Sequence, residues 1–149
     1  MERGRTIARQ LLATIAFAVL PAAATLAQTA AAPTPGVALK GHDTVAYFTE
    51  NHPVLGTPKN RYDWDGTRYL FSSAKNRDAF AANPDRFAPQ FGGLCATGIG
   101  MGAKVAADPN VWKIVDGKLY VFSSVQAKQE VEKDPALLTR AHQVWKGAK

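Results

Sequence analysis

The chain contains one nine-residue pattern twice. Residues 65–73 have the sequence DGTRYLFSS and residues 116–124 have DGKLYVFSS, and the register then continues to Pro84 and Pro135. Each copy predicts a tight turn, a strand with aromatic residues, a serine helix cap, a helix and a proline that ends the helix. A solenoid needs about three or more copies. We therefore expect a duplicated unit inside one domain.

The two Asp-Gly dipeptides predict β-hairpins. Both central positions of a type I′ turn need positive φ, which Asp and Gly tolerate. Alternation places Tyr69 and Phe71 on one strand face, and Tyr120 and Phe122 on the equivalent face of the second copy. The predicted strands are 62–64, 67–71, 111–115 and 118–122, and the predicted helices are 74–83, with Phe80 inward, 125–133, and 135 to about 145. The predicted fold class is α+β: a small single domain with two β-hairpin–helix units and a C-terminal helix.

Two further stretches are less regular. Residues 41–48 (GHDTVAYF) predict an entry turn followed by a short strand or helix. Residues 92–108 hold five glycines, which indicates close-packed turns or a mobile loop around Cys95.

The N-terminus predicts export. Three arginines precede an apolar run, Leu11 to Leu20, which is followed by Pro21 and small residues. This is the layout of a signal peptide, and the run is far shorter than the roughly 20 residues of a spanning helix. We assign residues 1–27 to a signal peptide, 28–36 to an Ala/Pro/Thr-rich linker and 37–149 to the folded domain. The predicted location is periplasmic or secreted, without stable membrane insertion after cleavage.

The basic residues do not predict a nucleic-acid site. The formal net charge is +6, and it becomes +4 once the signal peptide, with three arginines and one glutamate, is removed. Lysines and arginines are scattered, and no basic run alternates with aromatic residues. We expect no nucleic-acid partner.

Cys95 is the single cysteine, so an exported form of this chain cannot form an internal disulfide. Gly92 and Gly93 lie just before it and leave room for backbone N–H groups to face the sulfur, which favours the thiolate. The alternative is that Cys95 is a small buried hydrophobic residue. The residues alone leave both interpretations open.

The three histidines differ in their surroundings. His42 precedes Asp43, a carboxylate that can orient the imidazole, although Asp43 can equally be a helix cap beside an ordinary turn residue. His52 lies in a polar loop before Pro53, and His142 lies on an amphipathic helix face, so we expect neither to be a ligand.

A soft metal site composed of Cys95, His42 and Met101 would suit Cu(I), for which thiolate, imidazole and thioether are natural ligands. No CxxC or HxxxH spacing adds to this hypothesis. No nucleophile elbow, phosphate-binding loop or dinucleotide fingerprint is present.

The chain resembles the YHS domain family. The similarity rests on residues 41–48, on residues 69–73 with Asn76, Phe80 and Phe87, on residues 88–96 (APQFGGLCA) and on residues 117–120 (GKLY). The last two stretches are similar to the exported branch of that family, some members of which have selenocysteine at the position of Cys95. The resemblance implies a small α+β domain that handles metal ions, copper especially. The cysteines usual in metal-associated YHS domains are replaced here by Ala46, Ser72 and Asn76, so only Cys95 remains.

The sequence predicts an exported binding protein rather than a catalyst, with copper as its ligand at Cys95. An alternative is a thiol-redox protein in which Cys95 reacts and an outside thiol resolves the intermediate. A third is an interaction module without chemistry. The oligomeric state is left open.

Overall fold

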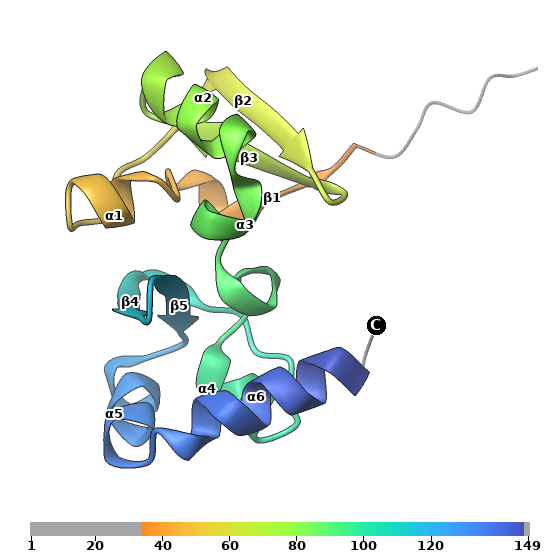
Figure 1. The fold of residues 1–149 in the computed structure, drawn as a ribbon, viewed down its shortest axis with the longest axis vertical. Helices are drawn as coiled ribbons and strands as arrows, with labels where there is room; N and C mark the ends of the chain where they lie inside the picture. Colours follow the sequence, from red (N-terminus) through yellow and green to blue (C-terminus); the bar gives the residue numbers. More distant parts are fainter. Residues whose placement is uncertain (1–33, 148–149) are drawn as a thin grey trace, which may run out of the picture. The chain divides into compact units, whose positions relative to one another are not determined.

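The computed structural model describes residues 34–147 of the chain. The first half contains β1 (Gly36–Val37), the 3₁₀ turn η1 (Ala38–Gly41), α1 (Ala46–Thr49), β2 (Thr57–Trp64), β3 (Thr67–Phe71), α2 (Ala74–Ala82) and α3 (Pro84–Phe87). The second half contains η2 (Gln90–Gly93), α4 (Ala96–Gly100), β4 (Asp108–Val115), β5 (Lys118–Phe122), α5 (Val125–Lys133) and α6 (Ala136–Gly147). The predicted α+β class with two hairpin–helix units and a C-terminal helix is confirmed (Figure 1).

Both hairpins form at the Asp-Gly turns. The turn residues Asp65 and Asp116 have φ of 48° and 50°, and the glycines after them have φ of 70° and 72°. β3 pairs with β2 and, in parallel, with β1, whereas β4 and β5 form a separate two-stranded sheet. β2 and β4 begin earlier than predicted because each contains an irregularity, between Thr57 and Arg61 and between Asp108 and Trp112. These irregularities interrupt the alternation that marks a strand.

The helices begin at the predicted serine caps. Ser73 Oγ accepts the Asn76 N–H and Ser124 Oγ accepts the Ala127 N–H, both at 3.1 Å. α2 ends at Ala82, and Pro84 then opens α3, a short helix that the sequence did not predict. Proline is tolerated there because the first turn of a helix has no acceptor for that N–H.

The duplication also includes the segment before each hairpin. η1 and η2 each contain three consecutive residues of positive φ, residues 39–41 and 91–93. Each turn is followed by one antiparallel bridge, His42 with Leu55 and Leu94 with Ala106. The glycine-rich stretch therefore contains an ordered turn and the helix α4 around Cys95.

Three clusters of buried side chains form the core. One belongs to the first half and includes Phe71 and Phe80, and one belongs to the second half and includes Cys95 and Phe122. The third is shared, because Leu39 and Tyr47 of the first half pack with Leu119 of the second. The Tyr47 hydroxyl also donates to the Pro109 carbonyl at 2.8 Å. The two halves therefore form one domain.

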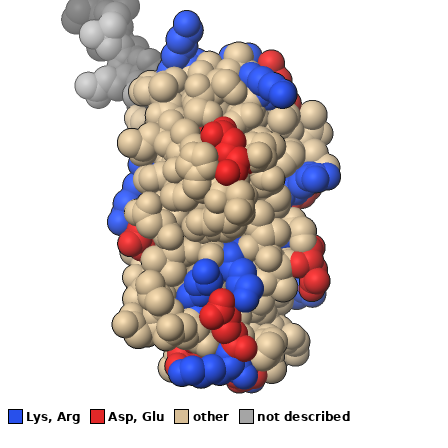
Figure 2. Space-filling view, turned by 90° about the vertical axis from the view of Figure 1, so that its left-hand side faces the viewer, with Lys and Arg blue, Asp and Glu red and all other residues tan. Residues whose placement is uncertain are grey.

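Several predictions concern the chain ends and the surface. The predicted signal peptide and most of the linker lie outside the described residues, and β1 begins at Gly36, the last residue of that linker. Within residues 34–147, no helix has the length and apolar character needed to cross a membrane. Figure 2 shows one face of the molecule, on which basic and acidic side chains are interspersed.

Candidate functional site

Cys95 is fixed by backbone contacts on two sides. Its N–H donates to the Val105 carbonyl at 2.9 Å, and the residue forms a parallel bridge with Val121 of β5. Cys95 is the N-cap of α4, and its Sγ accepts the Gly98 N–H at 3.5 Å. Only 1% of the residue is exposed. The sulfur thus has a defined position and one backbone donor.

A pocket of about 370 Å³ lies against Cys95. Met101, which caps the other end of α4 and is 74% exposed, lines the same pocket. The Thr97 hydroxyl is already engaged, because it donates to the Ala127 carbonyl at 2.6 Å. Ser123 is a further polar residue of the lining, and the remaining residues are apolar or small: Gly98, Ala103, Val105 and Ala127. The pocket therefore presents two sulfur-containing residues in mainly apolar surroundings.

Of the three predicted metal ligands, the structure brings two to one pocket. Cys95 and Met101 both line it, whereas His42 is not among the described residues around it. The His42 Nδ1 atom lies 2.9 Å from the Leu39 carbonyl oxygen, inside the η1 turn. His42 is therefore a turn residue that does not line the pocket at Cys95.

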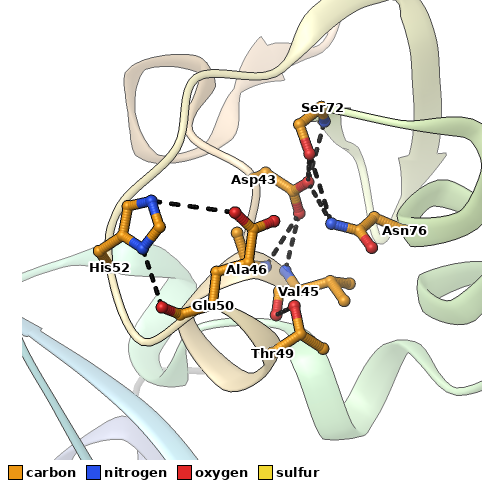
Figure 3. A network of polar contacts seen from close by, with 8 residues as sticks. All are labelled: Asp43, Val45, Ala46, Thr49, Glu50, His52, Ser72 and Asn76. Atoms are coloured by element: carbon orange, nitrogen blue, oxygen red, sulfur yellow. Dashed lines mark hydrogen bonds and ion pairs between the residues drawn. The ribbon is translucent and has the colours of Figure 1, made fainter.

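Asp43 is a cap and does not orient His42. Its Oδ1 accepts the N–H groups of Val45 and Ala46 at 2.9 and 3.3 Å, at the start of α1. Its Oδ2 accepts three bonds from Ser72 and Asn76, as Figure 3 shows. The bonds to Val45 and Ala46 are those of a capping carboxylate, although Asp43 lies two residues before Val45, the residue that directly precedes α1. The carboxylate is fully buried and closes the corner between α1, β3 and α2.

Cys95 occupies the position of Asp43 in the second copy. Each follows a left-handed turn by two residues and accepts an N–H from the residue three positions later. The Asp43 N–H donates to the Val54 carbonyl, and the Cys95 N–H donates to the Val105 carbonyl. Val105 follows Cys95 by one residue fewer than Val54 follows Asp43. A buried carboxylate in one copy is thus replaced by a buried thiol in the other.

The partners of Asp43 have changed in the second copy as well. When the two copies are aligned so that Asp65 corresponds to Asp116, Ser72 corresponds to Ser123 and Asn76 corresponds to Ala127. The side-chain amide of Asn76, which donates to the carboxylate in the first copy, is therefore replaced in the second copy by the methyl group of Ala127. Ser123 and Ala127 both line the pocket at Cys95. Polar side chains fill the first corner, and the second is left open beside a thiol.

The other two histidines have local partners. His52 is exposed and contacts Glu50, through the backbone carbonyl at 2.8 Å and the carboxylate at 3.8 Å (Figure 3). His142 Nε2 and the Tyr120 hydroxyl share a hydrogen bond of 2.8 Å. Burial lowers the pKa of His142 below its usual value, and the positive charges of Lys118 and Lys146 lower this pKa further. Neither histidine lies in the pocket at Cys95.

The donor set limits which metal ions fit. Among residues 34–147, no group of three or more His, Cys, Asp or Glu side chains is placed to hold an ion. A structural zinc site needs four such ligands, so the described residues do not provide one. Two sulfur donors suit an ion that accepts low coordination and soft ligands, which describes Cu(I).

Ser123 and Ala127 were missed by the sequence analysis, although the repeat pattern already aligned them with Ser72 and Asn76. The equivalence of Asp43 and Cys95 was hidden because the loop after Cys95 is one residue shorter.

No protein-family model, curated protein or solved structure matches this chain.

Proposed function

We propose that this protein binds Cu(I) in the pocket at Cys95, as a carrier or buffer and not as a catalyst. The main support is the contrast between the two copies. Asp43, Ser72 and Asn76 close the corner in the first copy, whereas the second copy has a thiol and an open pocket in that place. A structural core position needs neither the pocket nor the exposed Met101 beside it.

The donors fit the chemistry of the ion. The thiolate of Cys95 and the thioether of Met101 are soft ligands, and both residues line the same pocket. The Gly98 N–H donates to the sulfur, an arrangement that offsets negative charge on a thiolate. Met101 is exposed and its long side chain is flexible, so it can adjust to an ion held by Cys95.

The resemblance to exported YHS domains agrees with this proposal, because it implies metal handling outside the cytoplasm. The basic and apolar segment at the N-terminus agrees with export to the periplasm. Copper is then the cargo of the protein.

An anaerobic Cu(I) competition titration against a chromogenic chelator tests the proposal. We expect one equivalent bound by the wild type, loss of binding in Cys95→Ser, and affinity at least about tenfold weaker in Met101→Leu. His42→Gln is the matched control and is expected to bind like the wild type, because His42 lies outside the pocket. Binding that survives Cys95→Ser would overturn the proposal.

Ala127→Asn tests the role of the open pocket. The substitution introduces the residue that the first copy has at this position, and its amide would occupy space beside Cys95. We expect Cu(I) affinity to fall by about tenfold or more. Gln126→Asn, at the exposed neighbouring position on α5, is the control and is expected to leave affinity unchanged.

A second candidate function is thiol redox chemistry, favoured by the same Gly98 hydrogen bond to the sulfur. Peroxide would transfer one oxygen to the thiolate and release water, and an outside thiol would then form a mixed disulfide, because the chain has no second cysteine. Mass spectrometry after peroxide treatment distinguishes the two functions. Rapid gain of one oxygen at Cys95, without Cu(I) binding, would favour redox chemistry.

A further inference from the structure

A second cavity, of about 210 Å³, lies where the two halves meet, away from Cys95. The end of the first hairpin contributes Trp64, Asp65 and Tyr69, α3 contributes Asp85, and α6 contributes Trp145. The size suits a group of a few heavy atoms and is below the range of drug-sized ligands. The proposed metal site does not use this cavity.

The aromatic walls of the cavity are held in place by other rings. Trp64 packs against Tyr69 and Phe80, with centroid separations of 6.3 and 6.1 Å. Trp145 packs against Phe91 at 5.9 Å. The two indoles therefore belong to two different core clusters, and both line one cavity. Because these rings are already packed, little side-chain ordering is required when a ligand binds.

The charge of the cavity is negative although the protein is basic. Asp65 and Asp85 line it, and none of the described lining residues is a lysine or an arginine. Neither aspartate belongs to an ion pair among residues 34–147. The neighbouring Arg68 is engaged elsewhere, because its guanidinium contacts the Asp63 carboxylate at 2.7 Å.

His142 also lines the cavity and adds little positive charge at neutral pH. Burial lowers the pKa of this imidazole, and the nearby Lys118 and Lys146 lower it further. Both lysines lie outside the lining. The cavity thus combines tryptophan rings with carboxylates that have no cationic partner.

We propose that this cavity binds a small organic ammonium ion, with Trp64 and Trp145 against the cation and Asp65 and Asp85 as counter-charges. A cation near the face of a tryptophan ring is attracted by the electrons of the ring, and quaternary ammonium groups are recognised in this way. Asp65 and Asp85 are both exposed, so their carboxylates add an attraction that solvent weakens. We expect dissociation constants of about 1 mM for a compact ligand.

Choline is a suitable probe, and 3,3-dimethylbutan-1-ol is its neutral isostere. Two of the three tryptophans line the cavity, so intrinsic fluorescence reports binding. With the ionic strength held constant by sodium chloride, we expect a saturable change with choline and at least about tenfold weaker binding of the alcohol.

The double variant Asp65→Asn/Asp85→Asn removes the charges and keeps the shape. Asparagine suits the left-handed turn position of Asp65, so folding is preserved, and thermal melting verifies this. We expect choline affinity to fall by about fivefold or more. Asp116→Asn is the control, because it makes the same change in the other hairpin, outside the cavity. Equal binding of choline and the alcohol, unchanged affinity in the double variant, or no saturation would each overturn the proposal.

Discussion

Substitution of Asp43 by asparagine tests whether the closed corner of the first copy stabilises the fold. The carboxylate is fully buried and accepts five hydrogen bonds. Two come from Val45 and Ala46 to Oδ1, and three come from Ser72 N–H, Ser72 Oγ and Asn76 Nδ2 to Oδ2, at 2.9, 2.7 and 2.8 Å. Asparagine keeps the shape but replaces one of these oxygens by an NH₂ group, which is a donor.

The cost of Asp43→Asn follows from the groups that cannot adapt. The Ser72 hydroxyl can rotate and the Asn76 amide can turn to present an oxygen, but the Ser72 backbone N–H would face another donor. Leaving one such group unsatisfied costs about 1 to 3 kcal/mol. The bonds from Val45 and Ala46 also lose their charge assistance, which roughly halves their strength. We expect a loss of about 3 kcal/mol in the free energy of unfolding.

Urea denaturation followed by circular dichroism measures this loss. Asp63→Asn is the matched control, because it makes the same chemical change at an exposed carboxylate paired with Arg68. That variant is expected to lose clearly less stability, because solvent weakens an exposed ion pair. If Asp43→Asn is no less stable than Asp63→Asn, the corner does not stabilise the fold as argued.

Two further predictions concern pH and backbone packing. Because the pKa of His142 is lowered in the folded protein, the unfolded chain binds more protons below about pH 6.5, and stability should fall as the pH drops below that value. Urea denaturation at several pH values should show this dependence reduced in His142→Gln, and an unchanged dependence would contradict it. A Cβ on Gly56 would lie 2.3 Å from the Leu70 backbone, so Gly56→Ala should lose about 3 kcal/mol or more. Gly36→Ala, where no atom lies within 4 Å, is the control, and equal melting temperatures of the two variants would refute the packing argument.

The hairpins and long helices were predictable because their signals are local. The Asp-Gly turns fix two adjacent φ angles, and each serine cap binds an N–H three residues later. The start of β2 was not predictable, because Pro58 and the irregularity after Thr57 hide the strand pattern. The short helix α4 was hidden by the glycines within it.

The candidate site was predicted only in part, because its geometry depends on distant contacts. Cys95 and Met101 were expected to lie together, and they line one pocket. His42 was grouped with them because its imidazole is a copper ligand and because Asp43 beside it can orient the ring. The η1 turn directs its imidazole to the Leu39 carbonyl, and Leu39 itself has φ of 42°, a conformation that its sequence does not signal.

The asymmetry between the copies has a physical cause in the loop that follows each cap. The loop after Cys95 is one residue shorter than the loop after Asp43, and it lies close against α4. A Cβ on Gly98 would lie 3.0 Å from the Ala103 carbonyl oxygen and 3.1 Å from the Val105 side chain, whereas the equivalent residue in the first copy is Ala46. A side chain at the position whose N–H donates to the sulfur would therefore be crowded by the short loop, which favours glycine there. Gly98, Ala103 and Val105 all line the pocket, so the short loop that crowds this position of α4 also forms part of the wall beside the thiol.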